Sequence, residues 1–102
     1  MANFPSDSVK RLYHAVASLE TEEQCARFLE DLCTIKEVQD MAQRLDTAIL
    51  LDKGMNYQTI SREVGISTAT ISRVSRCLNY GQGGYREVLE LLKKSVAAEE
   101  KS

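Results

Sequence analysis

The fold is decided by the stretch YQTISREVGISTATISRVSRCL, which runs from Tyr57 to Leu78. Two apolar-periodic segments meet in it at Gly65, a residue that can adopt the positive φ with which many helices end. Ile66 can then fill the turn, and the hydroxyl of Ser67 can accept a backbone hydrogen bond at the start of the next helix. This order of residues predicts a helix-turn-helix over about residues 57–80.

The second helix of this motif has two faces of different chemistry. Ile71, Val74 and Leu78 recur at helical spacing and are expected to be buried. The opposite side and its margins carry small, hydroxyl or arginine side chains, namely Thr68, Ala69, Thr70, Ser72, Arg73, Ser75 and Arg76. Small side chains let a helix approach base edges, hydroxyls bond to bases or phosphates, and arginine can bind guanine or phosphate with two hydrogen bonds. A face kept only for solvent would more often carry Glu and Lys pairs, so we interpret this one as a DNA-reading surface.

Charge is distributed unevenly along the chain. The formal net charge is −2, which argues against indiscriminate nucleic-acid binding. Residues 1–52 hold ten acidic and five basic side chains, whereas residues 53–86 hold five basic side chains against the single acidic residue Glu63. No acidic residue occurs between Val64 and Tyr80. The basic segment therefore coincides with the predicted helix-turn-helix.

The remaining sequence predicts an all-α fold of about six helices, because apolar residues recur at three and four and no long stretch alternates. A first helix can begin at Ser6 or Ser8, a second at the capping box Thr21–Gln24, and a third at the capping box Thr34–Glu37, which ends near Gly54. The expected buried stripes are Val9, Leu12, Tyr13, Val16 and Leu19, then Cys25, Phe28, Leu29 and Leu32, then Val38, Ala42, Leu45 and Ile49, and in a last helix Val88, Leu89 and Leu92, with Val96 at its end.

Several function classes are not indicated by the sequence. The 102 residues predict a single domain, 1–102, and neither a signal peptide nor a run long enough to span a bilayer is present, so we expect a cytoplasmic protein without a membrane partner. Cys25, Cys33 and Cys77 form no metal-ligand pattern and are interpreted as reduced thiols, mostly in the core. His14 is the only histidine, and no motif gives a catalytic residue a base. No enzyme activity, metal or cofactor is expected.

With these residues the chain resembles the Trp repressor superfamily, and in particular its YerC/YecD-type branch of small bacterial helix-turn-helix proteins. The resemblance covers about Cys33 to Lys94, including GMNYQTISREVGISTATISRVSRCL from Gly54 to Leu78. It implies an intertwined homodimer in which N-terminal helices, about residues 8–53, pack against the other chain. Leu50 and Leu51 make the third helix apolar on more than one side, which is consistent with such a dimer.

The resemblance also bears on ligand binding. Thr34, Arg44 and Arg73 lie where the best-known member of the family holds tryptophan, and they are the candidate effector-binding residues. Val74, however, stands where that pocket has a glycine, and Cys77 stands where it has a serine. The valine would occupy space that the indole ring needs, and a thiol is a weak hydrogen-bond partner. Tryptophan is therefore not expected to bind, and another small-molecule co-repressor is left open.

The leading hypothesis is a sequence-specific transcriptional regulator, a repressor, that binds a pseudo-palindromic operator on double-stranded DNA as a homodimer. The candidate DNA-binding residues are Asn56, Tyr57, Gln58, Ser67, Thr68, Ala69, Thr70, Ser72, Arg73 and Arg76. Asn56, Tyr57 and Gln58 are expected to position the motif on the DNA backbone, and the others to read bases or phosphates. The acidic first half leaves an alternative, a protein-interaction adaptor that uses the same fold without specific DNA binding.

Overall fold

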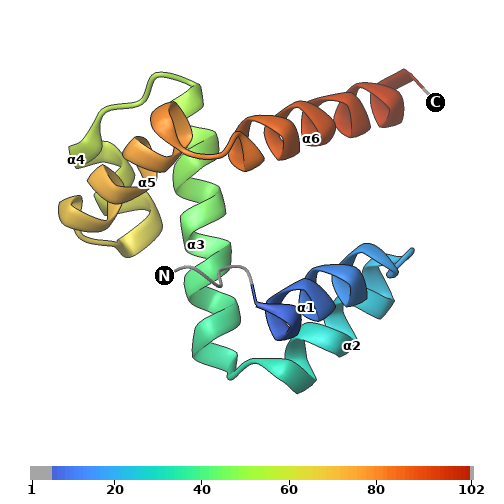
Figure 1. Ribbon diagram of the computed structural model, residues 1–102. Coiled ribbons are helices and arrows are strands. Elements are labelled where there is room, and N and C mark those ends of the chain that lie inside the picture. The colour runs from blue at the N-terminus through green and yellow to red at the C-terminus, as the bar shows by residue number, and fades with distance from the viewer. Residues whose placement is uncertain (1–5, 102) are drawn as a thin grey trace. The chain divides into compact units, whose positions relative to one another are not determined.

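The computed structural model describes residues 6–101, and side chains from Ser6 to Val96, and all regular elements in that range are helical. Six α-helices and one short π-helical turn follow one another, which confirms the all-α prediction of about six helices (Figure 1). The chain divides into two compact units, Met1–Val38 and Gln39–Ser102. A single domain over residues 1–102 stays a prediction.

The first unit contains α1 (Asp7–Ala17) and α2 (Glu22–Leu32). The hydroxyl of Ser6 accepts from the backbone N–H of Val9 at 3.2 Å. Thr21 and Gln24 form the complete capping box at the start of α2. Both predicted helix starts are thus confirmed, because local side-chain to backbone bonds determine them.

The predicted burial of the first two helices is wrong for this chain by itself. No residue of α1 or α2 is buried. Leu12, Tyr13, Val16 and Leu32 are 40%, 55%, 47% and 53% exposed. The apolar stripes exist, but two short helices offer each other too little surface to cover them.

α3 (Ile35–Asp52) begins at the second predicted capping box. The Thr34 N–H donates to Glu37 Oε1 at 2.8 Å, and the Glu37 N–H donates to Thr34 Oγ1 at 3.0 Å. The helix ends at Gly54, whose φ is +84°. There the N–H groups of Gly54 and Met55 donate to the carbonyls of Leu51 and Leu50, which is the hydrogen-bond pattern of a Schellman C-cap. Both predicted ends of α3 are confirmed.

The second unit contains the helix-turn-helix, formed by α4 (Tyr57–Ile60), the π-helical turn η1 (Ser61–Gly65) and α5 (Thr68–Tyr80). Its core comes from four helices, α3, α4, α5 and α6, and the buried side chains are Thr47, Ala48, Ile60, Ile71, Val74, Leu78 and Leu89. Figure 1 shows α4 and α5 gathered beside the C-terminal half of α3. The predicted buried face of α5 is confirmed.

The first helix of the motif differs from the expected regular α-helix, because its second half is the wider turn η1. Within it the Ser61 hydroxyl donates to the carbonyl of Ile66 at 2.6 Å. This bond draws the start of η1 and the turn together, and apolar periodicity carries no signal for it.

α6 (Gly84–Lys101) is as long as α3, at 18 residues each. Of its predicted core residues only Leu89 is buried, whereas Val88, Leu92 and Val96 are 41%, 40% and 53% exposed. An apolar groove of about 520 Å³ between α3 and α6 explains part of this exposure. Its lining residues are Ile49, Asp52, Lys53, Leu89, Leu92, Lys93 and Val96.

The cysteines are less buried than predicted. Cys25 and Cys33 are half-buried, and Cys77 is exposed on α5 rather than part of a core. All three are free thiols. Among the described residues no group of His, Cys, Asp and Glu is arranged to hold a metal ion, and none of the described helices is long and apolar enough to cross a bilayer.

Candidate nucleic-acid interface

Two helix caps and one glycine with a positive φ determine where the helices of the motif begin and end. Asn56 Oδ1 accepts from the Thr59 N–H at 2.8 Å and begins α4. Gly65, with a φ of +81°, ends η1. Ser67 Oγ accepts from the Thr70 N–H at 3.2 Å and begins α5. Gly65 and Ser67 were expected in these roles from the sequence, whereas the cap by Asn56 was not predicted.

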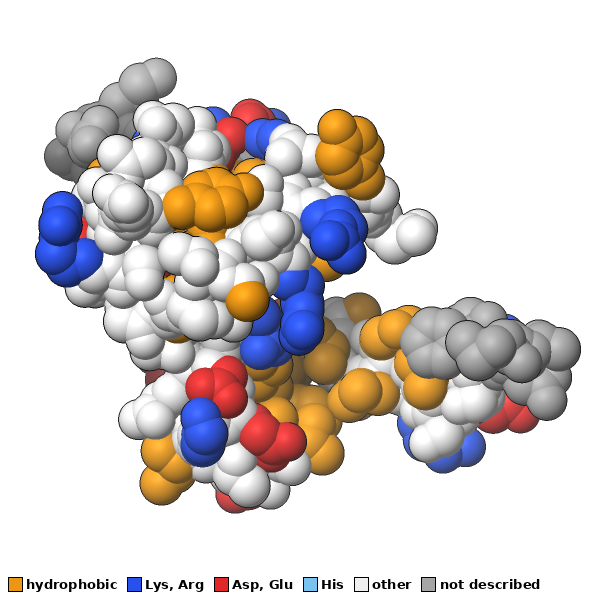
Figure 2. Space-filling model, turned by 90° about the vertical axis from the view of Figure 1, so that its left-hand side faces the viewer, with side chains coloured by type: hydrophobic (Ala, Val, Ile, Leu, Met, Phe, Trp, Pro, Cys, Tyr) orange, Lys and Arg blue, Asp and Glu red, His pale blue; other side chains and the backbone are white. Residues whose placement is uncertain are grey.

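The exposed face of α5 is the one predicted to read DNA. Ile71, Val74 and Leu78 are 0%, 2% and 6% exposed and point into the core. The exposed residues of this helix and its cap include Ser67, Thr68, Ala69, Ser72, Arg73 and Arg76. Viewed from the helix-turn-helix side, the surface consists largely of uncharged side chains and backbone, with Lys and Arg at its edges (Figure 2). An acid-free helix of this kind can lie in a groove without repelling phosphate.

Two of the predicted contact residues have a structural task as well. Ser67 Oγ and Thr70 Oγ1 lie 3.0 Å apart and share a hydrogen bond at the N-terminus of α5. Thr70 is half-buried, whereas Ser67 is exposed. The positive end of the helix dipole favours an anion at this end of α5. Ser67 and Thr70 therefore both support the helix N-terminus, and Thr70 offers less surface to a ligand than Thr68 or Ser72.

The three residues predicted to position the motif lie together at the start of α4. Asn56, Tyr57 and Gln58 are all exposed, Tyr57 by 39%. The side-chain oxygen of Asn56 is used by the cap, which leaves its amide N–H groups as the available donors. Donors and hydroxyls of this kind suit phosphate oxygens.

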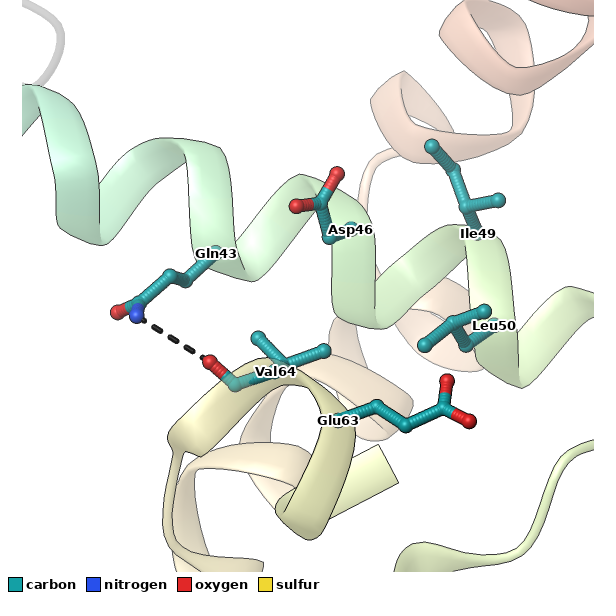
Figure 3. Close-up of a pocket in the computed structure, with 6 residues that line it drawn as sticks. All are labelled: Gln43, Asp46, Ile49, Leu50, Glu63 and Val64. Carbon is teal, nitrogen blue, oxygen red and sulfur yellow. Dashed lines mark hydrogen bonds between the residues drawn. The ribbon is translucent and has the colours of Figure 1, made fainter. Parts of the chain in front are cut away.

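A pocket of about 440 Å³, here called the acidic pocket, lies between α3 and η1 (Figure 3). Gln43, Asp46, Ile49 and Leu50 of α3 line it together with Glu63 and Val64 of η1. Gln43 Nε2 donates to the carbonyl of Val64 at 3.3 Å and so ties α3 to the turn. Two carboxylates without a lining cation make the pocket unsuited to phosphate or to a carboxylate effector.

The candidate effector residues line neither the acidic pocket nor the apolar groove. Thr34 belongs to the first unit and caps α3, whereas Arg44 is half-buried on α3 and Arg73 is exposed on α5. Val74 is 2% exposed and belongs to the core. An effector site at Thr34, Arg44 and Arg73 stays a prediction.

Four polar side chains form a cluster at the C-terminal end of α5, and the sequence did not predict it. Arg86 Nη1 lies 2.7 Å from Asp52 Oδ1, Arg86 Nη2 donates to Asn79 Oδ1 at 3.1 Å, and Lys93 Nζ lies 2.9 Å from Asp52 Oδ2. The hydrogen bond from Lys93, with Arg86 beside it, holds the pKa of Asp52 below its ordinary value, and Asp52 in turn raises the pKa of Lys93. Asp52 and Arg86 are 34 residues apart, so no local pattern indicates their pairing.

Comparison with known proteins gives a consistent result. Residues 7–93 match the family model described as Trp repressor protein. The uncharacterized protein YerC of Bacillus subtilis (strain 168) is 49% identical over 85 residues, which are 83% of this chain and 82% of that protein. A crystal structure of a TrpR-like protein from Eubacterium eligens ATCC 27750 is similar with a TM-score of 0.82 and 42% identity, over 86% of this chain and 91% of that one. A structure from Staphylococcus aureus, assigned provisionally as a Trp repressor, gives a TM-score of 0.80 and 42% identity, over 84% and 86% of the two chains.

Proposed function

The chain belongs to the Trp repressor protein family, a family of DNA-binding regulators and not of enzymes, and from this premise we propose that it is a sequence-specific transcriptional regulator that binds double-stranded DNA as a homodimer. It represses by occupying a pseudo-palindromic operator and so blocking polymerase, and it works in the cytoplasm, where bacterial DNA lies. The observation that carries the proposal is the acid-free, exposed face of α5, with Ser72, Arg73 and Arg76 on it.

The roles of the face follow from its chemistry. Arg73 and Arg76 reach phosphates or guanine edges, Thr68 and Ser72 approach bases, and the methyl of Ala69 contacts a thymine methyl. At the start of α4, Asn56, Tyr57 and Gln58 contact the DNA backbone and so position the motif on the DNA. Ser67 and Thr70 direct the N-terminus of α5 toward the DNA and stabilise that end of the helix.

The homodimer is supported by apolar surface that the chain does not cover itself. Leu32 and Ile35 in the first unit are 53% and 78% exposed. Leu91 and Val96 on α6 are 62% and 53% exposed. A second copy that covers these side chains removes apolar area from water, the dominant favourable contribution to association. Two reading heads then meet successive major grooves about 34 Å apart, which requires an operator with two-fold symmetry.

Selection of bound sequences from a random DNA pool tests the proposal directly. The expected result is a palindromic motif whose half-sites are about one helical turn apart. The variants Arg76→Ala and Ser72→Ala should then lower affinity for the selected site, whereas Arg27→Ala, a change on α2 outside the motif, should not. A pool that shows no enrichment, from a folded protein, would refute the assignment.

Salt dependence separates the two kinds of arginine contact. Each phosphate contact adds about 0.9 to the slope of log affinity against log salt concentration. If Arg76 holds phosphate in both heads, Arg76→Ala should reduce the slope by roughly 2 and weaken all sequences alike. If Arg76 instead reads a base, Arg76→Ala should leave the salt slope unchanged and weaken the preference for one base at one position of the operator.

The protein-interaction adaptor remains the second candidate, supported by the ten acidic side chains of residues 1–52. An association with DNA that does not weaken as salt rises would favour it. A small-molecule effector is a separate proposal, with Thr34, Arg44 and Arg73 as its contacts. Calorimetry against amino acids and nucleotides tests it. We expect tryptophan to give no heat of binding, because the buried side chain of Val74 fills the space that the indole ring would need.

A further inference from the structure

The four polar side chains behind α5 join three helices through one guanidinium. Asp52 is the last residue of α3, Asn79 lies near the end of α5, and Arg86 and Lys93 belong to α6. Arg86 uses one terminal nitrogen for Asp52, at 2.7 Å, and the other for Asn79, at 3.1 Å. Lys93 takes the second carboxylate oxygen of Asp52. We call Asp52, Asn79, Arg86 and Lys93 the Arg86 cluster.

The cluster continues along α5 toward the reading face. Asn79 Oδ1 accepts from Arg86, and Asn79 Nδ2 donates to the Ser75 carbonyl at 3.0 Å and lies 3.4 Å from its hydroxyl. The opposite orientation of the amide would place two donors against each other, so its direction is fixed. A line of hydrogen bonds thus runs from Asp52 through Arg86 and Asn79 to Ser75, the residue before Arg76.

Stability is a poor explanation for this arrangement. The side chains of Arg86 and Lys93 are 50% and 60% exposed, and exposed ion pairs contribute little to folding. Geometry is a better explanation, because a planar guanidinium that bonds two partners fixes their relative direction. At the other end of the motif Gln43 ties α3 to η1. Gln43 and Asp52 are about 13 Å apart along α3, so this helix holds the motif at two points.

The connection between α5 and α6 gives the cluster further importance. Gly81 has no room for a side chain, because a Cβ there would meet the Cys77 carbonyl, and Gly83 has a φ of +89°. Two glycines that take these conformations make a tight connection, but they do not by themselves fix the rotation of α5 about its axis. The burial of Ile71, Val74 and Leu78 fixes that rotation, and the bond from Arg86 to Asn79 joins the exposed C-terminal end of α5 to α6.

We propose that Arg86 is a positioning residue for DNA recognition: it holds the C-terminal end of α5 at the angle that presents Ser72, Arg73 and Arg76 to the operator, without touching DNA. The inference rests on the proposed function. Disruption of the cluster should therefore reduce the preference for the operator over random DNA, while the number of phosphate contacts is unchanged.

The test compares Arg86→Ala and Asn79→Ala with the control Lys94→Ala, which removes one positive charge from the exposed surface of α6 outside the cluster. Each cluster variant should weaken binding to the selected operator by roughly three- to thirtyfold. Affinity for random DNA, the salt slope and the melting temperature should stay those of the control. The double variant should be no weaker than the weaker of the two single variants, because each of them already breaks the bond between Arg86 and Asn79.

A fourth variant, Arg86→Lys, retains the charge, but one ammonium cannot reproduce the two directed bonds of the guanidinium. It should behave like Asn79→Ala rather than like the native chain. Full native affinity of Arg86→Lys would overturn the proposal, as would equal weakening on operator and random DNA with a smaller salt slope, or additive losses in the double variant. If Arg86→Ala fails to fold, Asn79→Ala and Arg86→Lys carry the test. If the native chain itself selects no sequence from the pool, the proposed function fails before this inference is tested.

Discussion

α1 and α5 are alike in sequence pattern and unlike in structure. Each begins at a serine whose hydroxyl accepts from a backbone N–H three residues on, Ser6 in α1 and Ser67 in α5. Each carries an apolar stripe at helical spacing. Yet α5 buries Ile71, Val74 and Leu78, whereas α1 buries no residue. An amphipathic pattern shows which face of a helix will be covered, and it does not show whether the same chain supplies the cover.

The difference separates the helix-turn-helix, which is packed within the chain, from α1 and α2, which are not. The helix-turn-helix completes its own core with residues from α3 and α6, such as Ala48 and Leu89. The first unit leaves large apolar side chains in contact with water. We therefore expect substitutions in the two regions to affect different quantities, folding in one and association in the other.

The largest effect is expected from Ile71→Ala. This side chain is completely buried, so the substitution removes apolar contacts and leaves a cavity, at a cost of about 2–5 kcal/mol in the free energy of unfolding. Urea denaturation measures it. The control Ser72→Ala, on the exposed side of the same helix, should change stability by no more than about 0.5 kcal/mol. Equal losses of stability in the two variants would contradict the difference between the buried and exposed faces of α5.

Leu32→Ser should act on association. If a second copy covers this half-exposed side chain, its replacement should raise the dimer dissociation constant by roughly tenfold or more, since a buried leucine contributes about 1.5–3 kcal/mol. Sedimentation equilibrium is the measurement, with Glu30→Ala on the opposite side of α2 as the control. A native chain that is monomeric at micromolar concentration would show that the first unit does not depend on a second copy.

Glycine substitutions should sharpen the account of the turn. Gly65 has a φ of +81° and open space around its Cα, so Gly65→Ala carries backbone strain alone, about 1–2 kcal/mol of lost stability. Gly84 also has open space but a negative φ at the start of α6, and Gly84→Ala should stabilise the protein by up to about 1 kcal/mol. Thermal denaturation of the pair separates strain from packing. A loss of stability in both variants would contradict this account.

The smallest effect concerns pH. The pKa of Asp52 is lowered in the folded protein by Lys93 and Arg86, so the stability that it contributes is present above about pH 4 and is lost as the pH falls through the lower folded value. Native chain and Asp52→Asn should therefore differ in urea denaturation at pH 7 and converge near pH 2. A difference that persists at acid pH would show that Asp52 acts through packing instead of charge.

Local signals account for most of what the sequence predicted. Thr21 and Thr34 begin helices through bonds to the residue three positions on, and Gly54 and Gly65 end them through a positive φ, so both signals can be predicted from local sequence. The exposed face of α5 followed from a stripe of apolar residues and from the absence of acidic ones.

The predictions that failed depend on residues far apart in the sequence or on a surface that this chain does not supply. The bond between Asp52 and Arg86 spans 34 residues, and the hydroxyl of Ser61 donates to the Ile66 carbonyl across a π-helical turn that apolar periodicity does not predict. Leu32 and Val96 have apolar patterns that predict burial, but both are more than half exposed. An apolar pattern predicts which side chains prefer burial, and it contains no information on which surface covers them.

The exposure of Cys77 has a practical consequence for distance measurement. It is the exposed one of the three free cysteines and lies on α5 itself, one residue after Arg76. A nitroxide attached to this native thiol would place a paramagnetic centre on α5 of each chain. In a two-fold symmetric assembly the dipolar coupling between the two centres gives the separation of the heads, with and without DNA.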